Sequence, residues 1–236
     1  MATLQEIISH SRRIVFFGGA GVSTESGIPD FRSVDGLYNT AYAFPPEEIL
    51  SHHFFREDPE EFFRFYRNKM LFPHALPNAA HQKAAELEAA GRLTSVVTQN
   101  IDGLHTAAGS RRVWELHGSV HRNTCTACGR KFTLADILAT EGIPRCPCGG
   151  IIKPDVVLYE ESLDDRVLEG ALRDISAADC LIVAGTSLSV YPAAGLVEYF
   201  RGDHLVIINK TPTRADRDAE LVITDPVGET LEKITV

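Results

Sequence analysis

Short apolar runs, each ending in glycine or polar residues, recur along the chain and predict the strands of a sheet. The clearest are RIVFFGGAG (13–21), LTSVVTQNID (93–102), CLIVAGTSL (180–188) and HLVIINK (204–210), with a weaker one in RVWELHGS (112–119). Runs that are continuously apolar and rich in Val and Ile are typical of strands buried on both faces of a parallel sheet. The sequence therefore predicts at least four buried strands.

Helical periodicity fills the intervals between these runs. Residues 78–91 predict a helix with Asn78 as N-cap and Gly91 just beyond its end, and residues 163–178 predict another. The N-terminal segment predicts a short amphipathic helix with Leu4, Ile7 and Ile8 on its apolar face. Strands that alternate with helices indicate a doubly wound, Rossmann-like α/β sheet.

Polar residues follow each predicted strand, where a parallel sheet binds its ligands. We expect these ends to converge on one cleft: Gly21 to Ser23, Gln99 to Asp102, His117, Thr186 to Ser187, and Asn209.

Two segments interrupt the alternation and predict a small inserted lobe. Residues 37–77 are rich in aromatic and helix-forming residues and indicate a helical module, and residues 120–153 contain four cysteines. We expect one catalytic domain over 1–236, in which the large lobe comprises 1–36, 78–119 and 154–236.

Composition narrows the possible partners. The chain has 236 residues, 44% of them hydrophobic, and a formal charge of −9, which argues against direct nucleic-acid binding because such proteins usually carry a basic excess. No run approaches the ~20 apolar residues that span a membrane, and no secretory leader is visible. We therefore expect a cytoplasmic protein without membrane association.

Four of the five cysteines form two close pairs, CTAC and CPC. The spacing of Cys125, Cys128, Cys146 and Cys148 predicts one tetrahedral, structural zinc site with no open position. A redox role for the first pair would leave the second pair unexplained. Cys180 lies within a predicted strand and is expected to be a buried, small hydrophobic residue.

The glycine cluster after the first strand departs from the dinucleotide fingerprint G-x-G-x-x-G. Counting from Gly19 and Gly21, the third position is Thr24. The loop is therefore either a tight turn that needs glycine or a backbone cradle for a diphosphate.

Taken together, the motifs resemble those of the sirtuins, the NAD-dependent protein-lysine deacylases. The resemblance covers nearly the whole chain in order: GAGVS-x₃-GIPDFRS, TQNID-x-LH, HGS, the cysteine pairs, KPDVVLYEE, GTSLSVYPA and VIINK. It implies that acetyl groups are removed from protein lysines with release of nicotinamide and O-acetyl-ADP-ribose. NAD is then the co-substrate, zinc is structural, and acylated-lysine proteins are the partners.

The resemblance also assigns roles to residues. His117 is implied as the catalytic base, which suits an imidazole with an ordinary pKa near ~6.5, and Asn100 as a second catalytic residue. Asp102 and the backbone of Ile101 would bind the nicotinamide carboxamide, with Phe31 blocking its return. The other implied NAD contacts are Gly19, Ala20, Gly21, Thr24, Asp30, Arg32, Gln99, Gly185, Thr186, Ser187, Asn209 and Lys210. Val157, Leu158 and Tyr159 would pair with the substrate backbone by strand addition.

Two histidines near these motifs are expected to be structural. His81 is interpreted as a packed or capping residue and His105 as a structural neighbour of the site. The adjacent His52 and His53 point apart on a helix, so a metal site there is not expected.

The chain departs from the family pattern in its substrate loop, which has LYEE where many members have Phe-Gly-Glu. With Asp164 and Asp165 these glutamates form either an acidic rim that favours basic substrates or a solvated surface. In sirtuins that prefer succinyl or malonyl groups, a Tyr-x-x-Arg pair binds the acyl carboxylate. Here the pair is Tyr66 and Lys69. Either both face the acyl pocket, or Tyr66 packs in the module and Lys69 lies in solvent.

Other activities remain as alternatives at this stage. An ordinary NAD dehydrogenase is disfavoured by the missing third glycine and by the lack of an acidic residue after a second strand. A zinc-based binding module that senses NAD, protein mono-ADP-ribosyl transfer and removal of other acyl groups are the remaining possibilities.

Overall fold

The computed structural model describes residues 2–30 and 44–236, so Phe31 and Arg32, predicted to contact NAD, lie outside the described residues. A six-stranded parallel sheet organises the larger lobe, in the order β3-β2-β1-β7-β8-β9. Its strands are β1 (Ile14–Gly18), β2 (Leu93–Thr98), β3 (Val113–Glu115), β7 (Cys180–Ala184), β8 (His204–Ile208) and β9 (Leu221–Ile223). The strand order reverses between β1 and β7, as in a doubly wound dinucleotide-binding fold, so the predicted fold class is confirmed.

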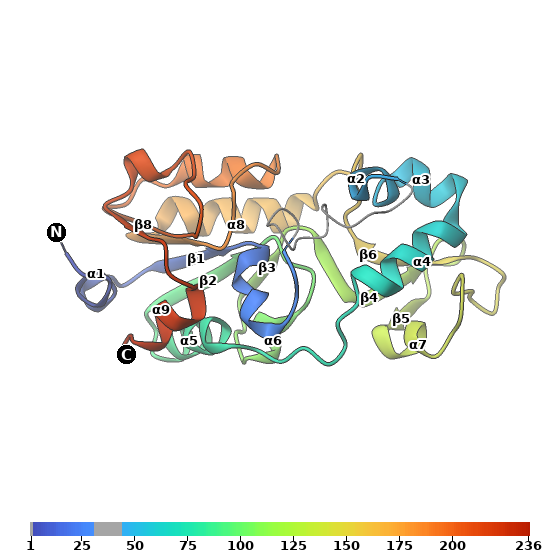
Figure 1. Ribbon diagram of the computed structural model, residues 1–236, viewed down its shortest axis with the longest axis horizontal. Coiled ribbons are helices and arrows are strands. Elements are labelled where there is room, and N and C mark those ends of the chain that lie inside the picture. The colour runs from blue at the N-terminus through green and yellow to red at the C-terminus, as the bar shows by residue number, and fades with distance from the viewer. Residues whose placement is uncertain (1, 31–43) are drawn as a thin grey trace.

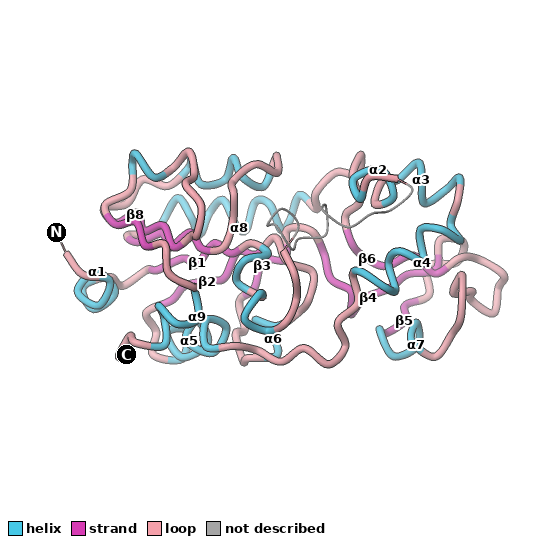
Figure 2. Tube along the Cα trace, viewed as in Figure 1, coloured by secondary structure: helices cyan, strands magenta, loops and turns pink. Residues whose placement is uncertain are grey.

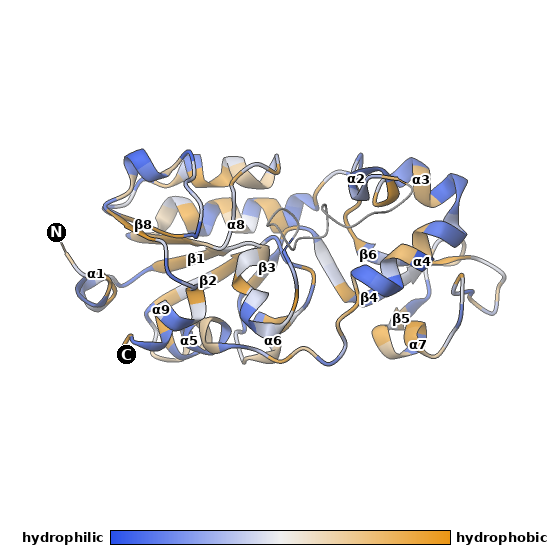
Figure 3. Cartoon of the chain, in the orientation of Figure 1, coloured by the Kyte–Doolittle hydropathy of each residue, from blue (hydrophilic) through white to orange (hydrophobic). Residues whose placement is uncertain are grey.

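Helices cover both faces of this sheet (Figures 1 and 2). In β1, Ile14 and Phe16 face one side, and Val15 and Phe17 face the other, because side chains alternate along a strand. The first face is covered by α1 (Leu4–His10), α5 (Ala79–Ala89) and α9 (Val227–Glu232), and the second by α8 (Asp165–Ala177) and the 3₁₀ segment η4 (Ala193–Tyr199). The apolar strands therefore lie between two helical layers, as the hydropathy colouring in Figure 3 shows.

The ends of these helices follow from local sequence. The Asn78 side chain accepts a hydrogen bond from the Ala80 N–H at 2.9 Å, and Gly91 follows α5 with φ of +73°, a conformation that favours glycine. Asp164 caps α8 through the Arg166 N–H at 2.8 Å. Shorter elements complete the lobe: α6 (Leu104–Ala107), η1 (Ala20–Val22), η2 (Thr24–Ser26) and η5 (Asp216–Asp218).

The smaller lobe lies at the other end of the molecule (Figure 1) and combines four helices with a second sheet. Its helices are α2 (Pro46–Ile49), α3 (His52–Glu57), α4 (Pro59–Lys69) and α7 (Leu134–Leu138), and its antiparallel strands, in the order β5-β4-β6, are β4 (Gly118–Cys125), β5 (Lys131–Thr133) and β6 (Ile152–Val156). Residues 118–119 and 154–156, assigned to the large lobe from sequence, thus lie in strands of the second sheet. The exact lobe boundaries stay a prediction.

Aromatic rings form the core of the smaller lobe. Phe55, Phe62 and Phe63 meet edge to face with centroids 5.0–6.1 Å apart, and Tyr66 stacks on Phe62 at 5.8 Å. Rings at these separations attract one another in addition to burying large apolar areas. The repeated phenylalanines of 54–65 are therefore packing residues.

Arg67 of α4 joins the helical module to the cysteine-containing module. Its guanidinium donates to the Ile137 carbonyl and the Thr140 hydroxyl, both at 2.9 Å, and to the Gly142 carbonyl at 3.1 Å. These acceptors lie at or beyond the end of α7, where helix carbonyls lack intrahelical partners. One side chain thus satisfies polar groups across the junction of the two modules.

Replacing Arg67 with alanine is expected to lower the free energy of unfolding by about 2–4 kcal/mol, because several charge-assisted hydrogen bonds are lost together. Urea unfolding monitored by far-UV circular dichroism measures the change in the free energy of unfolding. Arg64→Ala, which removes an exposed arginine paired with Glu61 on the same helix, is the matched control and should cost less than about 1 kcal/mol. Equal losses in the two variants would contradict the bridging role.

No helix in the described ranges 2–30 and 44–236 is both long and apolar enough to cross a membrane.

Candidate active site

Two glycine-containing turns meet where the strand order reverses. The β1 turn packs on the β7 turn so closely that a Cβ at Gly19 would lie 2.7 Å from the Gly185 carbonyl oxygen, and one at Gly21 would lie 2.8 Å from the Gly185 Cα. Gly185 itself has φ of +58°, and a Cβ there would collide with the Val22 nitrogen. Glycine is required at all three positions by backbone contact.

The N–H groups of the β1 turn are largely used within the protein. Gly19 donates to the Ala184 carbonyl at 3.0 Å, and Gly21 donates to the Gly185 carbonyl at 2.8 Å. These two donors hold the β1 and β7 turns together in this conformation. Ala20, between these two glycines, lines the cleft.

A cleft of about 570 Å³ opens beside these turns, and both lobes line it. All predicted NAD, catalytic and substrate residues in the described ranges line this cleft: Gly19, Ala20, Gly21, Thr24, Asp30, Gln99, Asn100, Ile101, Asp102, His117, Gly185, Thr186, Ser187, Asn209, Lys210, Val157, Leu158, Tyr159, Tyr66 and Lys69. The structure brings together residues separated by most of the chain.

His117 lies between the two lobes, just after β3. Its Nδ1 is 2.9 Å from the Gln99 carbonyl oxygen, which only accepts, so Nδ1 carries the proton of the neutral ring. The other nitrogen, Nε2, then has a free lone pair, and no group in the described ranges hydrogen-bonds to it. Burial lowers the pKa of His117 from its ordinary 6.5, against a smaller opposing effect of the Gln99 carbonyl. The ring is therefore neutral and able to accept a proton near pH 7.

A polar chain runs through Ser23, which the sequence placed at the cleft without assigning it a role. The Ser23 hydroxyl donates to Asp102 Oδ2 at 2.7 Å and accepts from the Asn100 side-chain amide at 3.0 Å. Asp102 Oδ1 also accepts from the Leu104 N–H at 2.9 Å. The side chains of Asn100 and Asp102 are thus oriented together by a residue of the β1 turn. The position of Ser23 directly after the glycine cluster was the signal that pointed to it.

His81 extends this chain and is also a capping residue, as predicted. Its Nδ1 accepts from the Asn78 N–H at 3.2 Å, so Nε2 carries the proton and faces the Ser23 hydroxyl at 3.4 Å. Burial lowers the pKa of His81 to about 4. The predicted structural role of His105 agrees with its full burial between Phe16 and His81, with ring centroids 5.6 and 4.6 Å away.

The segment Val157–Tyr159, which follows β6, also lines the cleft. The Val157 N–H donates to the His117 carbonyl at 3.0 Å, and the Tyr159 N–H donates to the Leu50 carbonyl at 2.9 Å. One edge of this segment is thereby fixed to both lobes. The predicted pairing with a substrate strand stays a prediction.

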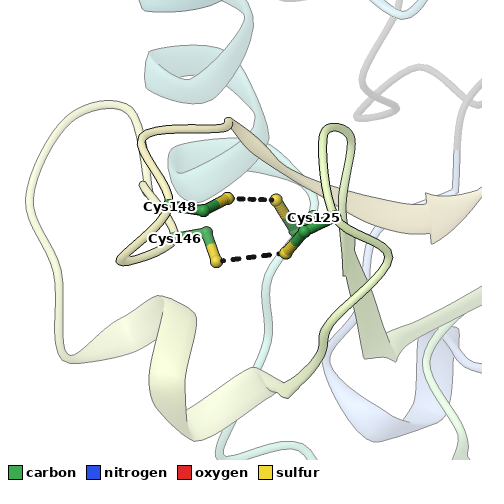
Figure 4. Close-up of side chains that lie close together, drawn as sticks. Cys125, Cys146 and Cys148 are labelled. Carbon is green, nitrogen blue, oxygen red and sulfur yellow. Dashed lines mark hydrogen bonds between the residues drawn. The ribbon is translucent and has the colours of Figure 1, made fainter.

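The four cysteine sulfurs of the smaller lobe gather at the tips of two loops (Figure 4). All four lie within 4.8 Å of one another, with the Cys125–Cys148 and Cys128–Cys146 sulfur pairs at 3.5 and 3.7 Å. A tetrahedron of Zn–S bonds of about 2.3 Å has sulfur–sulfur edges of about 3.8 Å, which these distances approach. The N–H groups of Cys128 and Ala127 lower the pKa of Cys125 to about 6, which favours the thiolate. The cluster therefore fits a closed, four-sulfur zinc site.

Glycine also shapes this cluster. A Cβ at Gly150 would lie 2.7 Å from the Cys125 sulfur, so this position leaves room for the sulfur cluster. In the described ranges, this group of four is the one set of three or more potential ligand side chains close enough to hold a metal. Cys180 is buried in β7, as predicted.

The reversed strand order, the glycine turns and the neutral histidine between two lobes define a nucleotide-binding α/β enzyme with a zinc-type module. Comparison with known proteins identifies the group more closely: the Sir2 family model matches residues 19–192. The chain belongs to the Sir2 family, as its motifs predicted.

Similar proteins cover almost the whole chain. NAD-dependent protein deacetylases of Clostridium acetobutylicum and Cutibacterium acnes are 57% and 58% identical, covering 98% and 96% of this chain and 96% and 94% of those proteins. A solved structure described as Sir2 with a p53 peptide and NAD+ is 40% identical with a TM-score of 0.86, covering 96% of this chain and 93% of that one. A structure of Sir2 bound to acetylated peptide is 37% identical with a TM-score of 0.84, covering 96% and 93%.

Proposed function

We propose that this protein removes acetyl groups from protein lysines by consuming NAD. In the balanced reaction, acetyl-lysine, NAD and water give lysine, nicotinamide and O-acetyl-ADP-ribose. The observation that carries this proposal is His117, which presents a neutral Nε2 to a cleft bounded by the glycine turns and by Val157–Tyr159. The expected sites for the cofactor, the base and the substrate therefore lie in one cleft.

The residues that line the cleft suit the binding of NAD at its two ends. Gly19, Gly21 and Gly185 let the β1 and β7 turns pack against each other at the edge of the cleft, where the diphosphate would bind. The side chains of Thr186, Ser187 and Asn209 would hold the adenosine half. Asn100 and Asp102, oriented by Ser23, would hold the nicotinamide half. When bound, NAD supplies the electrophilic ribose carbon that takes the acyl oxygen as nicotinamide leaves.

The protein groups then position the reactants and move one proton. His117 accepts a proton from a ribose hydroxyl at Nε2, while its Nδ1–H stays bonded to the Gln99 carbonyl and fixes the ring orientation. The Val157–Tyr159 segment would align the acyl-lysine by strand pairing, which brings the amide oxygen close to the ribose. The four-cysteine site would hold one zinc ion that stabilises the smaller lobe and takes no part in the chemistry.

Mass spectrometry of the products from NAD and an acetyl-lysine peptide tests the proposal. The expected products are the free lysine peptide, nicotinamide and O-acetyl-ADP-ribose in equal amounts. NADH formation with an alcohol would indicate a dehydrogenase, and a peptide or protein that gains ADP-ribose would indicate transferase activity. NAD binding without nicotinamide release would indicate an NAD-sensing module.

The acyl group that this protein prefers is expected to be acetyl. Tyr66 and Lys69 both line the cleft, and the Tyr66 hydroxyl is buried without a hydrogen-bond partner in the described ranges. Lys69 has a positive charge but lacks the planar fork with which arginine binds a carboxylate through two hydrogen bonds. We predict a higher kcat/KM for acetyl than for succinyl peptides, with succinyl activity rising about tenfold in Lys69→Arg.

Matched acetyl and succinyl peptides of one sequence measure this preference. Arg64→Lys, which alters a neighbouring cation of α4 outside the cleft lining, serves as the control and should leave the ratio unchanged. A wild-type preference for succinyl would contradict the assignment of the acyl pocket. The cytoplasmic location and the absence of direct nucleic-acid binding stay predictions from the sequence.

A further inference from the structure

The loop between β6 and α8 contains a tight turn with a glutamate where such turns favour glycine. The Glu161 N–H donates to the Leu158 carbonyl at 3.0 Å, which closes a turn over residues 158–161. Glu160, the third residue, has φ of +76°. This left-handed conformation is unfavourable for a residue with a Cβ and persists where other contacts hold it.

Contacts with α3 hold Glu160 in this conformation. Its carboxylate accepts from the His53 N–H at 3.1 Å and from the His53 ring Nδ1 at 2.7 Å. Both bonds end on one residue in the first turn of α3. The side chain of Glu160 therefore ties the turn to the helical module and compensates for its backbone conformation.

Glu161 makes a second attachment to the same helix. Its Oε1 lies 2.9 Å from the His52 ring, and its Oε2 accepts from the Leu158 N–H at 2.9 Å and from the Lys153 ammonium at 3.0 Å. Two consecutive glutamates thus bind two consecutive histidines. Both carboxylates already accept hydrogen bonds from groups of the protein. They are therefore poorly placed to form an acidic rim that attracts basic substrates.

The backbone beside these glutamates lines the cleft. Tyr159 exchanges hydrogen bonds with the turn before α3, donating to the Leu50 carbonyl at 2.9 Å and accepting from the His52 N–H at 3.0 Å. Val157 donates to the carbonyl of His117. Any displacement of residues 158–161 therefore moves the segment next to the catalytic base.

We propose that Glu160 and Glu161 are positioning residues for the acyl-peptide substrate, which fix Val157–Tyr159 against α3 through His53 and His52. This inference rests on the proposed deacetylase function, because it assigns that segment to the peptide. The two glutamates act through the backbone they hold and do not touch the reacting atoms. They pre-organise the segment that lines the cleft, so that less conformational entropy is lost when the peptide binds.

Three replacements of Glu160 separate the attachment from the backbone conformation. Glu160→Ala is expected to raise the KM for an acetyl-lysine peptide about fivefold, with kcat and the KM for NAD within twofold of wild type. Glu160→Gln keeps an acceptor oxygen for His53, so its KM for the acetyl-lysine peptide should stay within twofold of the wild-type value. Glu160→Gly relieves the left-handed conformation but loses the carboxylate, so its Tm should equal or exceed that of wild type while the peptide KM rises as in Glu160→Ala.

Amide hydrogen exchange in the free protein provides a readout without substrate or NAD. The Leu158 and Tyr159 amides should exchange about tenfold faster in Glu160→Ala and Glu160→Gly than in wild type. Glu57→Gln, which removes the same charge from the exposed end of α3, is the matched control and should change neither exchange nor peptide KM.

Three outcomes would overturn the inference. One is a wild-type peptide KM in Glu160→Gly, which would show that the Glu160 carboxylate does not affect peptide binding. Another is unchanged amide exchange in Glu160→Ala. The third is a Glu160→Gln variant that weakens binding of basic peptides alone, which would indicate charge selection. Failure of the proposed function looks different, because wild type itself would then leave the acetyl peptide unchanged while the exchange result stands.

Discussion

His117→Ala is expected to lower kcat for deacetylation by about 10³-fold, because a general base contributes about 10²–10⁴-fold to a reaction of this kind. NAD binding should remain close to that of wild type, because the contacts proposed for the adenosine half come from Thr186, Ser187 and Asn209 in the turns after β7 and β8. Single-turnover kinetics and calorimetric titration with NAD measure the two effects separately.

His117→Asn is the matched variant for this experiment. An asparagine amide can still donate to the Gln99 carbonyl, as the Nδ1–H of His117 does at 2.9 Å, but it cannot accept a proton. The loss of kcat should therefore be as large as in His117→Ala, with a smaller effect on stability. Near-normal turnover in either variant would show that another group is the base.

The pH dependence of wild type follows from the same residue. Burial lowers the pKa of His117 below 6.5, so the neutral, proton-accepting form persists to a lower pH than for an exposed histidine. Activity should fall as pH decreases through this lowered pKa, which places the midpoint of the acid limb below about 6.5. A midpoint clearly above that value would be inconsistent with the buried ring as the base.

Loss of the zinc site is expected to have the largest effect on stability. Replacing Cys128 with serine removes one of four sulfurs that lie within 4.8 Å of one another, and it should destabilise the smaller lobe by about 4 kcal/mol or more. Metal binding provides free energy of folding in such modules, whose apolar core is small: Cys125, Cys146, Ile137 and Ile152 form its buried cluster. Zinc content by elemental analysis and thermal unfolding by calorimetry measure the result.

Cys180→Ala is the control for this replacement. Cys180 is fully buried in β7, and burial raises the pKa of its thiol, so it is a packing residue outside the metal site. The control should retain one equivalent of zinc despite some loss of stability. Wild-type protein purified without chelators and found to lack stoichiometric zinc would refute the assignment.

Much of the fold was predictable because its signals are local. The Val- and Ile-rich runs of β1, β2, β7 and β8 lie between glycine turns and helical segments, and that alternation specifies a doubly wound sheet. Asn78 and Gly91 mark the ends of α5 through hydrogen bonding and backbone conformation that depend on neighbours only a few residues away. The spacing of the four cysteines likewise reveals a metal site, since each pair must fold around one ion.

Contacts between distant segments were decided only by the tertiary structure. The bond from Ser23 to Asp102 joins residues 79 positions apart, and that from His53 to Glu160 joins residues 107 positions apart. The sequence left the glycine loop open between a tight turn and a diphosphate cradle. The backbone contact of Gly19 and Gly21 with the β7 turn forms only when both strands are in place. Periodicity and turn preferences act over a few residues, whereas these partners are selected by how the sheet brings its strand ends together.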